Sequence, residues 1–315
     1  MVATVFIDGE AGTTGLQIRR RLEARSDVEL LHLDDNSRKD AGARKGMLNR
    51  ADLSILCLPE DASRDAVAMI DNPDARVIDA SIAYRTDPDW VFGFPEMTPE
   101  QPERIAKAKR VSNPGCYALS SISMLHPLIR AGVLAADFPA TINAVSGYSG
   151  GGKKLIADFE DPAAATYTES AFYHYALDLE HKHSEEIRVH GGLTHRPLFV
   201  PSVGRYAQGM ITSLPLQLWS LPGSPSAGDI HDALAAHYDG QRFVTVAPLS
   251  EAAAANKLDP EVLNGTNELR LQVFGNDTHG QAVVTALLDN LGKGASGQAM
   301  QNMNLMLGFE AGEGL

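Results

Sequence analysis

The sequence has 315 residues, 44% of them hydrophobic, so it can form one large domain or two smaller ones around a buried core. Its net charge of −13 excludes a general attraction to nucleic acid or to anionic membranes. The first residues lack the features of a signal peptide, and no stretch approaches the ~20 apolar residues of a membrane span. Two cysteines, Cys57 and Cys116, are too few for a disulfide framework. These features predict a cytoplasmic protein that binds any anionic ligand through locally placed cations.

A strand and a glycine-rich turn are predicted at the beginning of the chain. The strand covers residues 4–7, the glycines are Gly9, Gly12 and Gly15, and a helical pattern starts at Leu16. Such a turn lets the backbone approach a pyrophosphate, and the N-terminus of the helix supplies N–H groups and a positive partial charge. The spacing is GxxGxxG rather than GxGxxG, so an ordinary strand–turn–helix corner is the alternative.

Further alternation of strands and helices follows. Residues 28–33, 53–58 and 77–80 are predicted strands, and residues 62–70 a predicted helix. The apolar run 53–58 is typical of a parallel strand covered on both faces, which makes Cys57 a core residue. The pattern predicts an α/β, doubly wound Rossmann-type domain.

The end of the second strand bears on the choice of dinucleotide. Asp34 and Asp35 suit a ribose 2′-hydroxyl, whereas Ser37, Arg38 and Lys39 suit a 2′-phosphate. We expect NADP, with NAD as the alternative, and Lys39 equally fits a solvated loop.

The segment Ser112-Asn-Pro-Gly-Cys-Tyr117 is the most informative one. Asn113 is a suitable N-cap, Pro114 suits a first helical turn, and residues 118–128 have helical apolar spacing. Cys116 then lies in the first turn of a helix, where N–H groups and the helix dipole stabilise a thiolate. We predict a nucleophile there, with a buried structural cysteine as the alternative.

These motifs, with others along the chain, resemble a known family. The matching segments are the glycine turn 9–15 and residues 77–85, 92–96, 112–117, 146–153, 181–187 and 289–299. The sequence is similar to the short form of the N-acetyl-γ-glutamyl-phosphate reductases of arginine biosynthesis, and shares the wider plan of the aspartate-semialdehyde dehydrogenases. It departs from the pattern at Ala83-Tyr84, where Asp-Phe is expected, at Lys182, where arginine is expected, and at Ser184-Glu185, where Thr-Pro is expected.

The resemblance implies NADPH-dependent reduction of N-acetyl-γ-glutamyl phosphate to the semialdehyde through a thioester on Cys116. Such covalent catalysis needs an acid/base, for which we expect His183 first and His181 second. The two histidines would share one face of a strand but not of a helix. Metal ligation by His181, His183 and His190 is an alternative, although a complete ligand set is not evident. The N-acyl group of the substrate stays open, so another N-modified glutamyl or aminoadipyl phosphate, or an aspartyl phosphate, is an alternative.

Ligand-binding residues are expected from both halves of the sequence, and no metal is expected. Arg85 is predicted to clamp the substrate phosphate because its planar fork matches phosphate oxygens. The other expected substrate residues are Asn113 and Ser149. The expected cofactor residues are Gly9, Gly12, Thr13, Thr14, Gly15, Ser37, Arg38, Ser81 and Asn290.

Two other function classes compete with the reductase. Gly147-Tyr-Ser-Gly-Gly151 fits G-x-S-x-G and follows a predicted strand, as in a serine hydrolase that uses Ser149. Against this, the only His-Gly-Gly, residues 190–192, follows the serine instead of preceding it. A non-catalytic NADP-binding sensor is the other alternative.

The second half predicts an α+β catalytic and dimerisation domain with a mixed, largely antiparallel sheet. Residues 280–307 are predicted to be mostly helical, with Met300, Met303 and Met306 in the core. The expected domains are 1–115 for NADP, 116–280 for catalysis and oligomerisation, and 281–315 as a helical segment that returns to the first. The family resemblance implies a homo-oligomer, a tetramer or a dimer. The predicted strands are 141–145, 198–203, 210–218, 242–246 and 269–274, and the predicted helix is 230–238.

Overall fold

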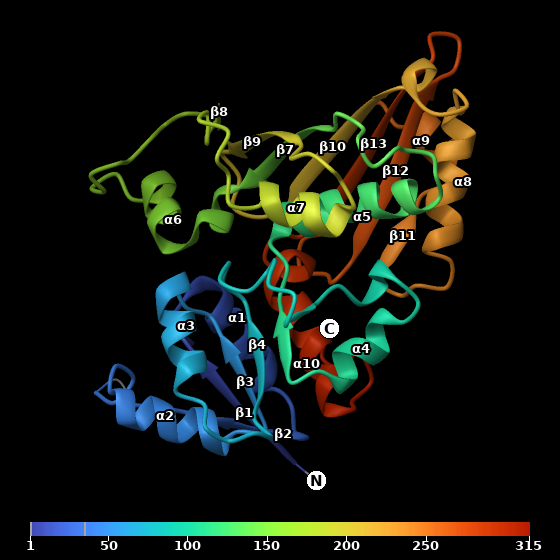
Figure 1. Cartoon of the computed structure of the whole chain (residues 1–315). Helices are drawn as coiled ribbons and strands as arrows, with labels where there is room; N and C mark the ends of the chain where they lie inside the picture. The colour runs from blue at the N-terminus through green and yellow to red at the C-terminus, as the bar shows by residue number, and fades with distance from the viewer. Residues whose placement is uncertain (1, 35) are drawn as a thin grey trace. The chain divides into compact units, whose positions relative to one another are not determined.

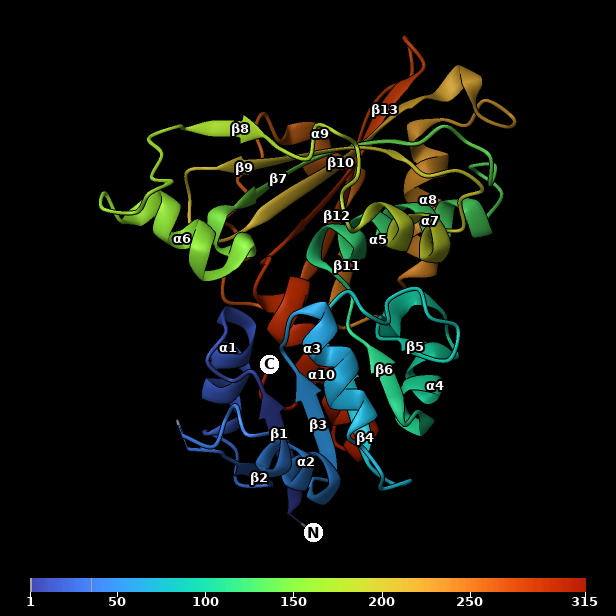
Figure 2. The same cartoon turned by 60° about the vertical axis from the view of Figure 1, so that its left-hand side comes forward.

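The computed structural model describes residues 2–34 and 36–315, which fold into two compact units (Figures 1 and 2). The first unit combines the chain up to Gly115 with Ala295–Leu315, and the second is formed by Cys116–Gly294. Each unit has its own sheet.

The first unit is built on a six-stranded sheet in which all pairings are parallel and the strand order is β2-β1-β3-β4-β6-β5. Val5 and Ile7 of β1 pack with residues of α1, α4 and α10, whereas Phe6 packs with residues of α2 and α3. Alternate residues of a strand thus face two helical layers, which confirms the doubly wound α/β domain. The elements are β1 (Ala3–Asp8), α1 (Thr13–Leu22), β2 (Val28–Leu31), α2 (Ala41–Arg50), β3 (Leu53–Leu56), α3 (Glu60–Ala68), β4 (Arg76–Asp79), β5 (Val91–Phe92), α4 (Gln101–Lys107), β6 (Arg110–Ser112) and α10 (Gly297–Leu307).

The helix α10 completes the core of the first unit from the far end of the sequence. Met300, Met303 and Met306 are at most 2% exposed and belong to the same apolar cluster as Val5. The prediction that these methionines pack in the core is confirmed.

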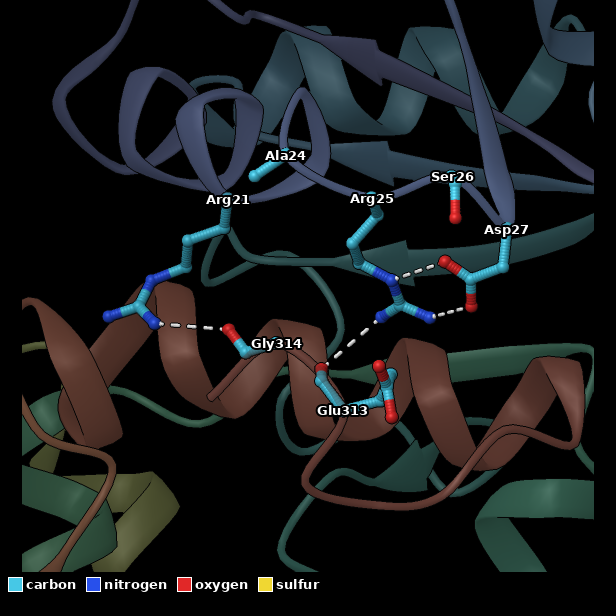
Figure 3. A pocket seen from close by; sticks show the side chains of 7 residues that line it. All are labelled: Arg21, Ala24, Arg25, Ser26, Asp27, Glu313 and Gly314. Carbon is cyan, nitrogen blue, oxygen red and sulfur yellow. Dashed lines mark hydrogen bonds and ion pairs between the residues drawn. The ribbon is translucent and has the colours of Figure 1, made fainter.

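The residues after α10 fold back onto the end of α1, where a hollow of about 570 Å³ lies between them (Figure 3). Arg25 forms two hydrogen bonds with the Asp27 carboxylate and one with the Glu313 carbonyl oxygen. Arg21 reaches the Gly314 carbonyl oxygen, and Leu315 packs against the apolar cluster. These contacts tie the terminal segment to the first unit.

The second unit is built on a seven-stranded sheet of order β11-β12-β13-β10-β7-β9-β8. Two neighbouring pairs, β11–β12 and β7–β9, are parallel and the other four are antiparallel. The helices α5, α7 and α8 lie side by side along one face of this sheet (Figure 2). This arrangement confirms the mixed, largely antiparallel α+β layer. The elements are α5 (Cys116–Arg130), β7 (Thr141–Gly147), α6 (Gly152–Glu160), β8 (Phe172–His174), α7 (Ser184–Gly191), β9 (Leu198–Gly204), β10 (Met210–Gln217), α8 (Ala227–His237), β11 (Val244–Val246), α9 (Leu249–Ala254), β12 (Leu269–Asn276) and β13 (Gln281–Leu288).

The predicted helical segment 281–315 is wrong in its first part. Gln281–Leu288 forms β13, which pairs along its whole length with β10 and β12. Gly280, with φ +60°, ends the tight connection from β12, and the β-branched residues that follow favour a strand. The segment that returns to the first unit therefore begins at Ala295.

Within residues 2–34 and 36–315, every helix is too short or too polar to cross a membrane.

Candidate active site

The glycine turn after β1 adopts a conformation that requires glycine at two positions. Gly9 has φ +93°, and a Cβ there would lie 2.4 Å from the Cys57 carbonyl oxygen. A Cβ on Gly15 would lie 2.5 Å from the Gly9 carbonyl oxygen. Helix α1 starts at Thr13 with Gly12 as its N-cap, so no side chain covers its first N–H groups. This geometry fits a pyrophosphate at the helix N-terminus.

Replacement of Gly15 by alanine tests the tight approach of α1 to the turn. The added Cβ would collide with backbone that cannot yield, so we expect the dissociation constant of NADP+ to rise at least about tenfold and stability to fall by about 1–3 kcal/mol. Fluorescence titration and thermal unfolding measure the two effects. Gly46→Ala is the control, because nothing lies within 4 Å of a Cβ at that position. Equal NADP+ affinity in the two variants would contradict the assignment.

The loop after β2 contains the residues expected to select the dinucleotide. The Asp34 carboxylate accepts a hydrogen bond from the Ser37 backbone N–H at 2.7 Å, and hydrogen bonding to the Ser37 side chain, together with this backbone bond, lowers the pKa of Asp34. Arg38 and Lys39 are exposed, and Asp35 lies outside the described residues. The loop therefore presents cations beside one engaged carboxylate.

A buried carboxylate lies at the carboxyl end of β4. Asp79 is fully buried and accepts hydrogen bonds from Ser63 Oγ and Ser81 Oγ, each at 2.7 Å. Burial raises the pKa of Asp79, and the two serine bonds oppose that rise. Ser81, an expected cofactor residue, is thus fixed at the strand edge that also carries the glycine turn.

Arg85 is buried and directed at main-chain oxygens. Its Nε donates to the Asn113 carbonyl at 3.1 Å, and its Nη2 donates to the Ala80 carbonyl at 3.1 Å. The loop that carries it is held by Arg64, whose Nη2 donates to the Ala83 carbonyl at 2.9 Å. The expected phosphate residue therefore sits in a defined orientation.

Asn113 lies three residues before the first residue of α5, Cys116, so the expectation that it occupies the N-cap position is wrong. The helix begins at Cys116, and the side chain of Asn113 donates to the Ala295 carbonyl and accepts from Asn302 Nδ2 at 3.0 Å. Its backbone N–H donates to the Asp79 carbonyl at 2.8 Å. These tertiary contacts hold the segment that leads to Cys116.

Cys116 is the first residue of α5, in the first turn as predicted, and it forms no disulfide and is half-buried. Its Cβ packs against Gly294, because a Cβ built on that glycine would lie only 2.8 Å away. Gly294 belongs to the π-helical turn Gly292–Ser296, and such turns are frequent at functional sites. The sulfur is thus held at the N-terminus of a 15-residue helix.

His181 and His183 lie in neither a strand nor a helix, but in the turn that leads into α7. Their ring centroids are 4.8 Å apart, and each ring is about 6 Å from that of Tyr117. His181 Nδ1 accepts the His183 backbone N–H at 3.1 Å, while Nε2 lies 3.3 Å from Tyr175 Oη. Both histidines therefore surround the residue that follows Cys116.

Two tyrosines complete this cluster, and Tyr175 was missed from the sequence. The hydroxyls of Tyr117 and Tyr175 interact, and Tyr117 also donates to the Ser202 carbonyl at 2.8 Å. Burial raises the pKa of both tyrosines, and a charge on Cys116 raises each further, which places the sulfur within electrostatic range. Between Tyr175 and His181, Ala176 and Leu179 have φ of 50° and 63°, an unfavourable conformation for non-glycine residues. Such strain cannot be anticipated from residue preferences.

Ser149 and Asn290 bind each other. Asn290 Nδ2 donates to Ser149 Oγ at 3.1 Å, and its Oδ1 accepts the Gly209 N–H at 2.7 Å. Ser149 lies in a short 3-10 turn after β7 with an amide as its partner, which does not support a hydrolase nucleophile. Nor do three His, Cys, Asp or Glu side chains come close enough to hold a metal ion anywhere in residues 2–34 and 36–315.

The two cysteines should react differently. Burial raises the pKa of Cys57 to about 12, so at pH 8 only about one molecule in ten thousand carries the thiolate there. We expect iodoacetamide at pH 8 to modify Cys116 and to spare Cys57 in the folded protein, as read by peptide mass spectrometry. Modification of Cys57 at a comparable rate would show that its thiol is accessible and is not kept protonated by burial.

The fold is shared with solved aspartate semialdehyde dehydrogenases. One from Vibrio cholerae, described as complexed with ASA, superposes with a TM-score of 0.73 at 15% identity and covers 98% of both chains. One from Candida albicans, described with NADP, gives 0.66 at 13% identity with full coverage of both. At these identities the likeness concerns the fold.

Sequence comparison is more specific. Residues 4–105 match the family described as "Semialdehyde dehydrogenase, NAD binding domain", and residues 116–290 match "Semialdehyde dehydrogenase, dimerisation domain". N-acetyl-gamma-glutamyl-phosphate reductase 2 of Pseudomonas putida is 55% identical over 304 residues, 96% of each chain. The N-acetyl-gamma-glutamyl-phosphate reductase of Brucella suis is 51% identical over 98% of this chain and all of its own. With a cysteine opening α5 and a dinucleotide turn after β1, the chain belongs to the N-acetyl-γ-glutamyl-phosphate reductases, within the semialdehyde dehydrogenase family.

Proposed function

We propose that this protein reduces N-acetyl-γ-glutamyl phosphate to N-acetyl-glutamate semialdehyde and phosphate, with NADPH, through a thioester on Cys116. The observation that carries the proposal is Cys116 at the start of α5, next to Tyr117 and the turn of His181 and His183. The names of relatives more than 50% identical supply the substrate.

Acylation uses the sulfur and the helix N-terminus. The Cys116 thiolate attacks the acyl carbonyl, a C–S bond forms, and the bond from the acyl carbon to the phosphate oxygen breaks. The first N–H groups of α5 stabilise the oxyanion of the tetrahedral intermediate. A proton taken from the thiol passes through a histidine to the departing phosphate, whose oxygens Arg85 binds.

Reduction releases the sulfur again. When bound at the glycine turn, NADPH supplies a hydride for the acyl carbon. The resulting hemithioacetal then collapses, its C–S bond breaks, and Cys116 leaves as a thiolate. Solvent replaces the proton that left with phosphate.

The contacts of the two histidines favour His183 as the acid/base. His181 Nδ1 accepts a backbone N–H, so its neutral ring carries the proton on Nε2, facing Tyr175. Protonation at Nδ1 would break the bond that shapes the turn. His181 thus holds the turn, and His183, 4% exposed, exchanges the proton.

Asparagine substitutions separate the two roles. We expect His183→Asn to lower kcat by about 10²–10³-fold, the usual effect of losing a general acid/base. His181→Asn should cost less than about tenfold, because its amide oxygen can still accept the backbone N–H that Nδ1 accepts now. Steady-state kinetics and thermal unfolding of both variants measure this, and a larger loss in His181→Asn would reverse the assignment.

NADP, rather than NAD, is the proposed dinucleotide, and Ser37 and Arg38 after β2 support it. The cytoplasm stays our expected compartment, supported by two cysteines that form no disulfide. A homo-oligomer, a tetramer or a dimer, stays a prediction that light scattering tests.

The reaction run in reverse tests the proposal. The enzyme receives N-acetyl-glutamate semialdehyde, phosphate and NADP+, and NADPH formation is followed. Parallel assays replace the substrate by aspartate semialdehyde and NADP+ by NAD+. Faster turnover of aspartate semialdehyde would overturn the substrate, and equal use of NAD+ would overturn the cofactor preference.

A further inference from the structure

We infer that Asp79 is a positioning residue that sets Arg85 for phosphate, a role resting on the proposed function of Arg85. Asp79 lies at the carboxyl end of β4 and is 0% exposed. Buried carboxylates are rare unless their oxygens accept hydrogen bonds or pair with a cation, so the contacts of Asp79 indicate its role.

Each oxygen of the Asp79 carboxylate holds a different serine. Oδ1 accepts from Ser63 Oγ of α3, and Oδ2 accepts from Ser81 Oγ, both at 2.7 Å. Ser81 Oγ in turn accepts the Ala83 backbone N–H at 3.0 Å. The carboxylate therefore fixes the first turn of the loop that carries Arg85.

The backbone of Asp79 holds the other side of Arg85. Its carbonyl accepts the Asn113 N–H at 2.8 Å, and the Asn113 carbonyl accepts Arg85 Nε at 3.1 Å. Arg85 Nη2 is bound by the carbonyl of Ala80, the residue after Asp79. The guanidinium thus spans the ends of β4 and β6, with both anchors attached to Asp79.

The charge of Asp79 also favours this placement of Arg85. The Asp79 carboxylate attracts the Arg85 guanidinium, since the two are electrostatically coupled. Tyr84 stacks on Trp90 at 4.0 Å between ring centroids, which restrains the loop beyond Arg85. A guanidinium whose main-chain anchors are fixed around a buried carboxylate keeps one orientation, as bidentate phosphate binding requires.

Asp79→Asn is the central variant, because it keeps the shape and removes the charge and one acceptor oxygen. Ser81→Ala, which removes the bond to Asp79 Oδ2 and the acceptor of the Ala83 N–H while keeping the Asp79 charge, is the second variant should Asp79→Asn fold poorly. The control is Asp52→Asn. Asp52 also accepts two hydrogen bonds, from the N–H and Oγ1 of Thr4, both at 2.8 Å. It precedes β3, at the amino end of the parallel strands, whereas Asp79 lies at the carboxyl end of β4. The reverse assay yields separate KM values for phosphate and semialdehyde. Hydrogen exchange of residues 80–86 monitors the loop.

We expect Asp79→Asn to raise the KM for phosphate at least tenfold and to accelerate exchange of the loop, with the KM for semialdehyde within twofold. Asp52→Asn should leave all three within twofold. A general structural defect would move both KM values and the melting temperature together. An unchanged KM for phosphate in Asp79→Asn, beside a raised one in Arg85→Ala, overturns the inference and leaves the proposed function standing. Absence of turnover in the unmodified enzyme overturns the proposed function, and loop exchange then decides whether Asp79 holds Arg85.

Discussion

Replacement of Cys116 by alanine is expected to abolish NADPH formation in the reverse reaction with semialdehyde, phosphate and NADP+. The value of kcat should fall by roughly 10⁴-fold or more, as it does on loss of a covalent nucleophile. Cys116 is the first residue of α5, and no other described thiol is placed to replace it, since Cys57 belongs to the other unit and packs, partly buried, against its apolar core. Because Cβ is retained, the packing against Gly294 and the fold should persist.

The measurement compares kcat and the binding of NADP+ in Cys116→Ala with those in Cys57→Ala. We expect NADP+ affinity to be unchanged in Cys116→Ala, because the glycine turn belongs to the other unit. Residual activity within tenfold of the unmodified enzyme would exclude the thioester. Lost turnover with intact NADP+ binding would also exclude a mere dinucleotide sensor.

Replacement of Gly294 by alanine is expected to have the next largest effect. The new Cβ would lie 2.8 Å from the Cys116 Cβ, 3.0 Å from Leu288 Cδ1 and 3.2 Å from the Asp289 carbonyl oxygen. With backbone behind it, the methyl group must push Cys116 out of place. A shift near 1 Å at a reacting atom costs on the order of 10²-fold in rate, and we expect that loss in kcat.

The control for this variant is Gly191→Ala in α7, where the added Cβ makes ordinary contact at 3.4 Å with Leu125. In Gly294→Ala, kcat and the rate of Cys116 alkylation should change together. In Gly191→Ala, both should stay unchanged. If kcat falls only in proportion to a lower melting temperature, the effect is on stability, and Gly294 does not set the sulfur.

Local patterns predicted the parts of the fold that depend on neighbouring residues. The apolar run at β3, the glycine turn and the helix that begins at Cys116 all follow from a few consecutive side chains. Helix α2 was missed, since Leu48 is its only buried residue and gives no apolar periodicity. β13 was predicted to be part of a helix, although its β-branched residues favour a strand, and its pairing with β10 and β12 fixes it as one.

The reactive groups of the site could be predicted from the sequence, but the contacts that hold them in place could not. Cys116 and the histidine pair stand out as residue types, whereas Tyr175 joins them only through an irregular loop. Asn113 has a strong local capping preference, yet its amide binds Asn302, 189 residues away. Long-range contacts of this kind leave no trace in a short window of sequence.

The return of α10 to the first sheet has a consequence for synthesis on the ribosome. The second unit is one uninterrupted stretch, Cys116–Gly294, and all of its strands are translated before α10. The first unit, although its strands are made earlier, cannot complete its core until α10 is available, because Val5 and Ile55 pack with the methionines of α10. The nascent chain is therefore expected to mature out of order, its middle before its beginning, and a stalled product that ends near residue 294 would expose the apolar face that chaperones bind.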